Sequence, residues 1–217
     1  MSLDKLLVHS HSQKYVIFDT ETEGLNLVSH RPWQLSWAIA KGKNIISEHD
    51  YAAKWPNINV SEGAAKVTGF NKSQYDKKAV DPVIVYEEFS KLLYDTSYVF
   101  VGHNILNFDI YMINTVQRLL GKEIMFPTDR CIDTKCLAIA VESNCPFEGK
   151  TPKDFMFWQY RVNTLPLKGL RINQEAMLKK LDIEYDQAKL HEALGDVRYT
   201  FEIMKKLLYK VDVPDFF

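Results

Sequence analysis

The sequence lacks the features that mark secreted and membrane-spanning proteins. No apolar run is long enough to cross a bilayer, and no secretory signal pattern opens the chain. There are only three cysteines, and their odd number and irregular spacing fit neither a disulfide framework nor a zinc site. We therefore expect a soluble, cytoplasmic protein with reduced cysteines and no contact with a membrane.

A surplus of positive charge is also missing, because the net charge is −1 at pH 7. A protein that covers long stretches of nucleic acid needs many cations to neutralise phosphates, so the balance argues against a large sequence-independent binding surface. An enzyme that holds only a few nucleotides remains possible, since bound metal ions would offset part of the negative charge.

The length of 217 residues and the hydrophobic content of 46% are typical of one globular domain. We expect a single domain over residues 1–217, with a loose N-terminus at 1–13 and a C-terminal tail at 210–217. The proline- and aromatic-rich segment 143–169 is expected to be a long loop or insertion with little regular structure.

Hydrophobic patterning predicts an α/β protein. Strands are expected at residues 15–18, 33–40, 44–51, 97–101 and 130–134. Helices are expected at residues 60–67, 82–93, 110–120, 135–141, 171–181 and 193–209. Three strands followed by alternating helices and strands predict a mixed sheet covered by helices on both faces.

Four acidic residues stand in three short segments that are far apart in the chain. Asp19 and Glu21 are two residues apart on an extended segment, so both side chains point to one face of the sheet. Neighbouring carboxylates are unfavourable unless a cation neutralises them. Asp109 and Asp196 each open a predicted helix, where alone they would be ordinary N-terminal acids. Together the four offer the hard oxygen ligands that a pair of Mg²⁺ or Mn²⁺ ions needs.

The three segments read FDTETEGL (18–25), GHNILNFD (102–109) and HEALGD (191–196). In this order they resemble the motifs of the DEDDh branch of the DnaQ-like 3′→5′ exonucleases, over residues 15–208. His191 stands five residues before Asp196, and Glu192 takes the position that is tyrosine in the other branch. The resemblance implies a ribonuclease H-like fold, with a mixed five-stranded sheet of three antiparallel strands plus parallel strands.

The resemblance also implies a mechanism. The four acidic residues would hold two divalent metal ions, Mg²⁺ or Mn²⁺, with Asp19 bridging them. His191 would take a proton from the attacking water, which suits an imidazole near neutral pH. The leaving group would be the 3′ oxygen of the penultimate nucleotide, so the product would be a nucleoside 5′-monophosphate.

Substrate contacts are implied for residues in the motifs and in the segment Val67–Phe70. They are Thr20, Thr22, Leu25, Thr68, Phe70, Asn104 and Phe108. Leu25 would be an apolar wedge between the last two bases, and Phe108 could stack on a base. For Phe70 and Phe108, plain packing in the core is an equal alternative.

The chain departs from the family pattern at three places. Glu23 stands where a small hydroxyl residue is common, which would put a further carboxylate beside the site. The gap from Asn104 to Asp109 is one residue longer than the commonest spacing, and the segment 143–169 has no clear counterpart.

Two other segments suggest partners. Basic residues interleave with aromatic ones in 143–169, so this segment either guides a single strand or packs its aromatics onto the core. The C-terminal tail, with its final Phe216 and Phe217, is spaced like peptides that dock on sliding clamps or contact a polymerase. The alternative is a tail folded onto its own domain.

We therefore predict a metal-dependent 3′→5′ exonuclease acting on single-stranded 3′ ends, with DNA favoured over RNA. The alternatives are an exoribonuclease or oligonucleotide scavenger, a proofreading subunit of a DNA polymerase, and a non-catalytic module that binds nucleic acid or a polymerase. The sequence leaves the oligomeric state undetermined.

Overall fold

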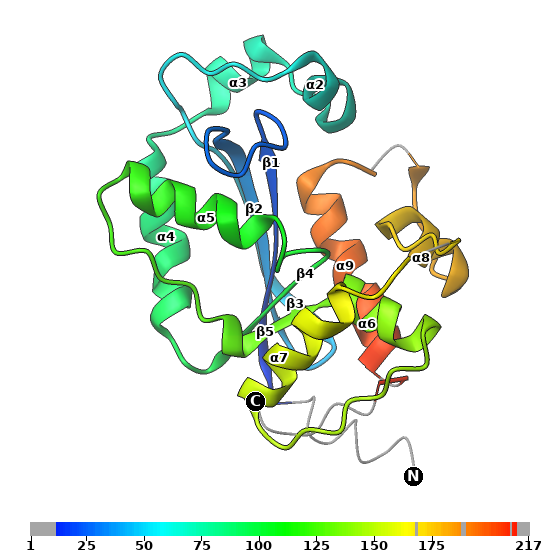
Figure 1. The fold of residues 1–217 in the computed structure, drawn as a ribbon. Coiled ribbons are helices and arrows are strands. Elements are labelled where there is room, and N and C mark those ends of the chain that lie inside the picture. The colour runs from blue at the N-terminus through cyan, green and yellow to red at the C-terminus, as the bar shows by residue number, and fades with distance from the viewer. Residues whose placement is uncertain (1–11, 168, 188–189, 209, 212–217) are drawn as a thin grey trace.

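The computed structural model describes residues 12–167, 169–187, 190–208 and 210–211 (Figure 1). Residues 1–11 and 212–217 lie outside the described residues, and the expectations of a loose N-terminus and of a clamp-docking tail fall largely on them. Within the described part of the chain, no helix has the length and apolar character required to cross a membrane.

A mixed sheet of five strands forms the centre of the molecule. Its strands are β1 (Lys14–Thr22), β2 (Pro32–Lys41), β3 (Asn44–Ala52), β4 (Tyr98–Gly102) and β5 (Cys131–Asp133). They lie in the order β3-β2-β1-β4-β5. β2 runs antiparallel to both β1 and β3, whereas β4 runs parallel to β1 and β5. The predicted mixed sheet, with three antiparallel strands followed by parallel ones, is confirmed.

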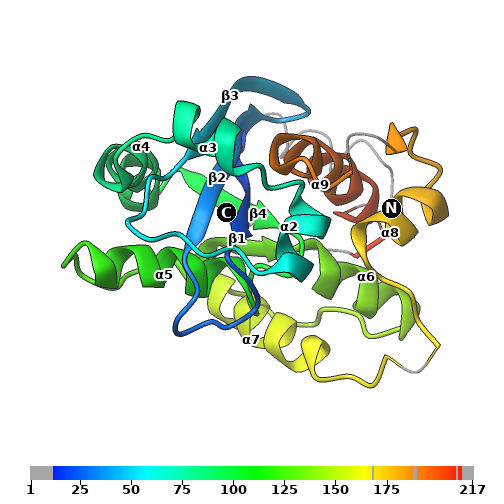
Figure 2. The same cartoon turned by 90° about the horizontal axis from the view of Figure 1, so that it is seen from above.

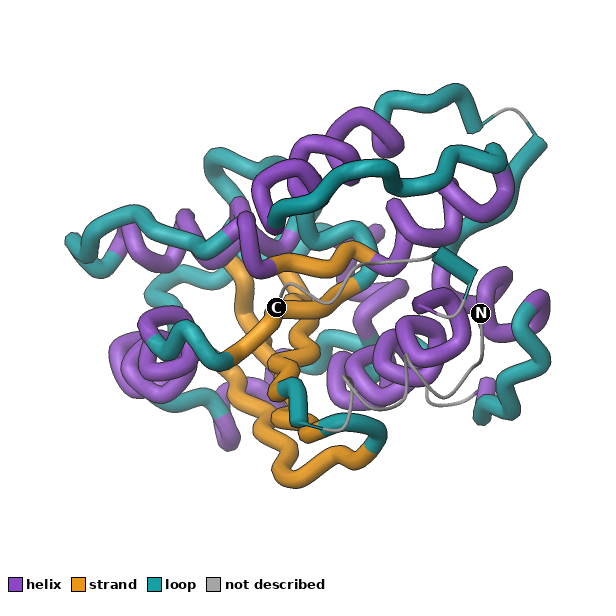
Figure 3. The backbone as a smooth tube through the Cα atoms, turned by 90° about the horizontal axis from the view of Figure 1, so that it is seen from below, coloured by secondary structure: helices purple, strands orange, loops and turns teal. Residues whose placement is uncertain are grey.

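Helices cover both faces of this sheet, as expected. They are α2 (Glu62–Thr68), α3 (Lys72–Lys78), α4 (Pro82–Tyr94), α5 (Asp109–Leu119), α6 (Thr134–Glu142), α7 (Pro152–Asn163), α8 (Gln174–Lys180) and α9 (Ala193–Leu208), with a 3₁₀ turn, η1 (Thr128–Arg130). α4 and α5 lie on one side of the sheet and α9 on the other, with α6 and α8 beyond it (Figures 1 and 2). The view from below shows the strands together between these two groups of helices (Figure 3).

The alternation of side chains along β1 decides what faces each layer. Phe18 points toward α4, where its ring lies 5.5 Å from that of Phe89 and 6.1 Å from that of Phe100 on β4. Tyr15 points the other way and packs against Phe201 of α9, 6.4 Å between ring centroids. Because side chains on a strand alternate, Asp19 shares the face of Tyr15 and is directed toward α9.

Several helix starts follow directly from the sequence. Ser61 caps α2 by accepting a hydrogen bond from the Ala64 amide. Asp81 caps α4 in the same way through the Val83 amide, and Pro82 occupies the first helical position. α3 was not predicted, although Asn71 caps it through the Gln74 amide.

The prediction of little regular structure in 143–169 is wrong for its central part, because α7 is a helix of 12 residues. Its start is a reciprocal capping box: the Thr151 hydroxyl accepts from the Asp154 amide, and the Asp154 carboxylate accepts from the Thr151 amide. Pro152 then takes the first position of the helix. The cap was visible in the sequence, but the density of prolines and glycines around it hid the signal.

α7 also covers the free edge of β5. The Gln159 side chain accepts a hydrogen bond from the Asp133 amide at 2.7 Å and donates one to the Cys131 carbonyl at 2.9 Å. These two backbone groups would otherwise be unpaired on an edge strand. The segment expected to be an insertion is therefore part of the packed domain.

Candidate metal centre and active site

The predicted acidic residues meet where β1 ends beside the start of α9 (Figure 1). Asp19 and Glu21 lie on β1 opposite Ser36 and Gln34 of β2. Asp196 lies in the first turn of α9. Carboxylate oxygens of Asp19, Glu21 and Asp196 all lie within 4.8 Å of one another. The pairing of an extended strand with a helix start thus brings together residues that are up to 177 positions apart in the chain.

Asp109, at the start of α5, is not part of that three-carboxylate group. Its Oδ1 accepts hydrogen bonds from the amide of Thr20 at 3.0 Å and from the Thr20 hydroxyl at 2.6 Å. Thr20 lies between Asp19 and Glu21 in the chain, so this pair of bonds fixes Asp109 close to both. Its charge is near enough to raise the pKa of each of them.

The pKa values show how poorly the protein alone accommodates these charges. Burial, and then the charge of Asp196, raises the pKa of Glu21 to about 8. Burial raises the pKa of Asp19 well above its usual range, and Asp109 and Glu21 add to the effect. Burial also raises the pKa values of Asp109 and Asp196, each to about 6.

The four carboxylates fit hard divalent cations. Among the described residues, no Lys or Arg forms an ion pair with any of them. Each carboxylate supplies oxygen ligands, and the group lies partly open to solvent. Mg²⁺ and Mn²⁺ prefer this donor chemistry, and a cation here would relieve the mutual repulsion.

His191 lies in the segment just before α9. Its side chain is exposed, and its backbone amide donates a hydrogen bond to Asp196 Oδ1 at 3.3 Å. Its φ of 68° is in the left-handed region, which is uncommon for a residue other than glycine. This geometry places the imidazole beside the acidic group, although His191 and Asp196 are separated by a turn and the helix start.

Glu23 was expected to put a further carboxylate beside the site, but the fold pairs it with Arg31. Its side chain is only 4% exposed and accepts hydrogen bonds from Arg31 Nη2 at 2.6 Å, from Arg31 Nε at 2.8 Å and from the Asn59 amide at 2.7 Å. Burial by itself would raise the pKa of Glu23, but these donors lower it. Arg31 also donates to the carbonyls of Pro56 and Asn57. The pair therefore closes the neck of the loop 23–31 and ties it to the segment before α2.

Asp133 is a functional candidate that the sequence did not reveal. It is fully buried at the end of β5 and accepts hydrogen bonds from the backbone amides of Asn104, Leu106 and Lys135 at 2.8, 3.1 and 3.0 Å. Burial raises its pKa, and these bonds oppose the rise. Asp133 thus holds the loop between β4 and α5 that leads to Asp109. The sequence held one signal for this role: Asp133 stands where the predicted strand 130–134 passes into the predicted helix 135–141.

His103 fixes the other side of the same loop. Its Nε2 donates to the Ile172 carbonyl at 2.9 Å, and burial lowers its pKa to about 4, so the ring is neutral. Nδ1 then accepts a hydrogen bond from the Thr134 hydroxyl at 2.9 Å. This histidine is structural and cannot readily serve as a proton acceptor.

The residues expected to contact substrate have different environments. The Thr22 hydroxyl donates to the Gly24 carbonyl, and the Leu25 side chain is 83% exposed at the tip of the loop 23–31. Thr68 Oγ1 accepts from the Phe70 amide. Phe70 packs on Trp33, with 4.9 Å between ring centroids, which supports the packing alternative for its ring.

On the loop before α5, Asn104 Oδ1 accepts a hydrogen bond from Lys135 Nζ at 2.9 Å. Asn104 has a φ of 74°. Phe108 directly precedes α5 and is partly buried, so a contact with a base and a contact with the core are both sterically open to it.

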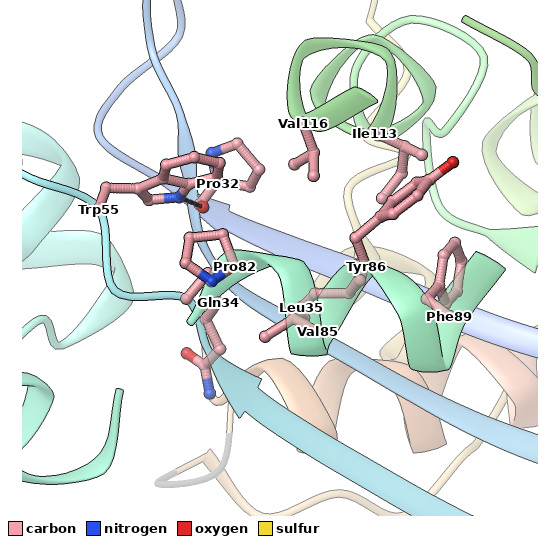
Figure 4. Close-up of a pocket in the computed structure, with 11 residues that line it drawn as sticks. Pro32, Gln34, Leu35, Trp55, Pro82, Val85, Tyr86, Phe89, Ile113 and Val116 are labelled. Carbon is pink, nitrogen blue, oxygen red and sulfur yellow. Dashed lines mark hydrogen bonds between the residues drawn. The ribbon is translucent and has the colours of Figure 1, made fainter. Parts of the chain in front are cut away.

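A separate apolar pocket lies between α4, α5 and β2 (Figure 4). Val85, Tyr86 and Phe89 line it from α4, and Ile113 and Val116 line it from α5. Its volume of about 20 Å³ is room for one water, but the almost wholly apolar lining offers few partners, so it is a packing gap and not a ligand site.

Comparison with known proteins agrees with this arrangement. The model of the RNase T exonuclease family matches residues 16–204. The chain belongs to this family. Its members are metal-dependent nucleases, and Asp19, Glu21 and Asp196 form a group that could hold a metal ion.

Two curated relatives are similar over 90% of the chain. The PolC-type DNA polymerase III of Bacillus subtilis (strain 168) is 28% identical over 196 residues, and that of Ureaplasma parvum serovar 3 is 25% identical over 201 residues. The chain spans only 11% and 12% of the length of these two proteins.

Solved structures of Escherichia coli exonuclease I share the fold. The zinc-bound complex with single-stranded DNA has a TM-score of 0.71 and 20% identity, and it is matched over 91% of this chain and 40% of that chain. The complex with a dT13 oligonucleotide has a TM-score of 0.69 and 18% identity, over 91% and 41% respectively. The ribonuclease H-like fold expected from the motifs is confirmed.

Proposed function

We propose that this domain is a 3′→5′ exonuclease of the DEDDh type that uses two divalent metal ions to remove nucleotides from single-stranded ends, with DNA as the preferred substrate. The observation that carries the proposal is the meeting of Asp19, Glu21 and Asp196 within 4.8 Å, with Asp109 and His191 beside them. Each of the five positions of the motif set is occupied by a residue with the required chemistry.

The four carboxylates are the residues that would hold the ions. Asp19 is the proposed shared ligand, because the charges of the other three all act on it. When bound, the ions supply Lewis-acid activation of a water and stabilise charge on the scissile phosphate. The chain itself contributes orientation: Thr20 fixes Asp109, and the backbone of His191 fixes Asp196.

His191 is the proposed general base. Its side chain is exposed beside Asp196 and is therefore free to reach a water at the metal site. Imidazole is the side chain best suited to accept a proton near neutral pH. The other motif histidine, His103, is excluded from this role by its two hydrogen bonds and by burial, which lowers its pKa.

Two features support a single strand as substrate. Leu25 stands 83% exposed at the tip of a loop whose neck is fixed by Glu23 and Arg31, as an apolar wedge requires. The exonuclease I structures of the same fold are complexes with single-stranded DNA. An exoribonuclease remains the alternative within this class, because reading a 2′-OH takes only one or two contacts.

A second candidate is a proofreading exonuclease that works with a DNA polymerase. It is favoured by the similarity of this chain to part of two PolC-type DNA polymerases. The chemistry would be the same, and the partner would differ.

The test is incubation of 5′-labelled single- and double-stranded DNA and RNA with the protein and Mg²⁺ or Mn²⁺. We expect a ladder that shortens from the 3′ end, fastest on single-stranded DNA, and no cleavage in EDTA. His191→Asn should lower the rate about 10²-fold or more while metal binding is kept. Release of labelled mononucleotide from the 5′ end, or activity in EDTA, would contradict the proposal.

A further inference from the structure

Exposed aromatic rings continue from the candidate active site onto α7. Tyr111 is two residues beyond Asp109 on α5 and is 45% exposed. Tyr160 and Phe157 on α7 are 38% and 57% exposed. Single exposed apolar side chains are common, whereas several exposed together on one surface often mark a binding site.

The position of Tyr160 is fixed by its neighbour in the chain. Gln159 forms hydrogen bonds with the backbone of Asp133 and Cys131 on β5. Tyr160, the next residue, therefore lies close to β5, whose last residue, Asp133, holds the loop before α5. Tyr111 on α5 and Tyr160 on α7 are thus both linked to Asp133, the first through the loop before α5 and the second through Gln159.

Positive charge accompanies these rings. Phe157 and Tyr160 are three residues apart, so they share one face of α7. Lys153 Nζ lies 5.9 Å from the Phe157 ring centroid, and the exposed Arg161 follows Tyr160 directly. On the other side of the loop before α5, Lys135 contacts Asn104.

An open hollow of about 370 Å³ adjoins this face of α7, lined by Phe157, Trp158 and Arg161 among others. Glu148 and Asp154 also line it, and their negative charge disfavours a phosphate there. A nucleobase is the part of a strand that fits, because it can stack on an aromatic ring and accept or donate hydrogen bonds.

From this arrangement we propose that Tyr111, Tyr160 and Phe157, with Lys153 and Arg161, form a track for the single strand 5′ of the two nucleotides at the reaction centre. The proposal rests on the proposed function. Bases stack on the rings without regard to sequence, and the two cations lie beside the backbone. Most of the track lies in the segment 143–169, for which the sequence analysis left two alternatives, a strand guide or core packing. In α7 the aromatic residues Phe155 and Trp158 are buried, whereas Phe157 and Tyr160 are exposed.

The experiment compares a trinucleotide with a 12-nucleotide single strand as substrates for Phe157→Ala/Tyr160→Ala. Stacking on each ring is worth enough that kcat/KM on the 12-mer should fall about tenfold or more, through KM, while the trinucleotide is affected far less. Tyr94→Ala is the matched control, since Tyr94 is an exposed tyrosine on α4 that is not part of the proposed track. Phe157→Trp/Tyr160→Phe should restore the preference for the longer strand.

Binding of a fluorescein-labelled 12-mer in Ca²⁺ is measured in parallel, so that the two proposals can fail separately. If the unaltered chain cleaves and the double variant keeps the same preference for the longer strand, the track is overturned and the proposed function stands. An unaltered chain that binds but does not cleave would overturn the proposed function, and weaker binding by the double variant would still support the track. Equal loss on both substrates, or equal binding by the double variant and Tyr94→Ala, would overturn it.

Discussion

The carboxylates near the candidate metal centre fall into two groups, which differ in what surrounds their charges. Glu23 and Asp133 are buried, and each is surrounded by donors from the protein: an arginine and backbone amides for Glu23, and three backbone amides for Asp133. Asp19, Glu21 and Asp196 have one another as neighbours.

The pKa values follow this difference. Arg31 lowers the pKa of Glu23 in spite of burial, whereas burial and the charge of Asp196 raise the pKa of Glu21 to about 8. Burial alone therefore does not mark a functional acid, because buried charges are tolerated where the fold supplies donors. Asp19, Glu21 and Asp196 have few such donors, so they are the candidate metal site, where a bound cation would neutralise their charges.

The largest expected effect is that of Asp19→Asn on activity. Removing the shared ligand should lower the rate about 10³-fold or more, since a metal contributes several kcal/mol to the barrier. In EDTA the free energy of unfolding should stay the same or rise, because one of several repelling charges is lost. Nuclease assays and urea denaturation measure the two quantities. Asp76→Asn, on the exposed face of α3, is the control. If Asp19→Asn unfolds more easily than this control in EDTA, Asp19 stabilises the fold, and the contrast with Glu23 and Asp133 is wrong.

Asp133→Ala should have the opposite signature. It leaves three backbone amides, one buried and two partly buried, without an acceptor, so we expect a loss of about 3 kcal/mol in the free energy of unfolding, with or without metal. Asp133→Asn, which keeps one acceptor oxygen, should lose less. The exposed Asp129→Ala serves as control, and urea denaturation at constant metal concentration gives the values. If the loss of stability depends on metal, Asp133 belongs with Asp19, Glu21 and Asp196.

Glu23→Gln should cost about 1–2 kcal/mol, because it weakens a hydrogen-bonded charge pair whose glutamate is buried and whose arginine is partly exposed. The loop 23–31 should also be cut faster by protease, since its neck is loosened. Glu48→Gln is the matched control: the Glu48–Arg198 pair has the same two-point contact but is more exposed, so its loss should cost less than ~1 kcal/mol. Equal costs at the two positions would show that burial of the Glu23 pair is unimportant.

Thermal stability should also depend on pH. The pKa of Glu21 is about 8 in the fold against 4.5 ordinarily, and those of Asp109 and Asp196 are about 6 against 3.8. The folded state therefore binds more protons than the unfolded state between about pH 4 and 8, and stability in EDTA should fall as pH rises through this window. Each kcal/mol lost lowers Tm by ~2–4 °C in a chain of this size.

Saturating Mg²⁺ should reduce this fall, because the ion binds the ionised carboxylates. Glu21→Gln should flatten the EDTA curve at its upper end, near pH 8. Scanning calorimetry from pH 5 to 8.5 measures both. Identical curves in Mg²⁺ and EDTA would contradict the assignment of these acids to a metal site.

Much of the fold could be predicted because its signals are local. The strand β1, the capped start of α4 and the amphipathic α9 are specified by apolar spacing and by Asp81–Pro82, all within a few residues. α7 was missed because its capping box lies among residues that usually mark loops. The five-stranded sheet with three antiparallel strands followed from the family resemblance. The order of the strands came only from the structure, because hydrophobic patterning alone gives no pairing partners.

The candidate site shows the same division. The residue types of Asp19, Glu21, Asp109, Asp196 and His191, and their order, are properties of the sequence, and they determined the chemical class. The hydrogen-bond partners of Glu23 and Asp133 cannot be taken from the sequence. Arg31 and Asn59 approach Glu23 only after the chain has folded. The same is true of Asn104 and Leu106 beside Asp133. The sequence shows only that a residue carries a carboxylate. The pKa and the role of that carboxylate depend on which donors or charges the fold places within a few ångströms. The sequence by itself determined the class of chemistry, and the tertiary structure decided which acids hold the fold and which are left for metal.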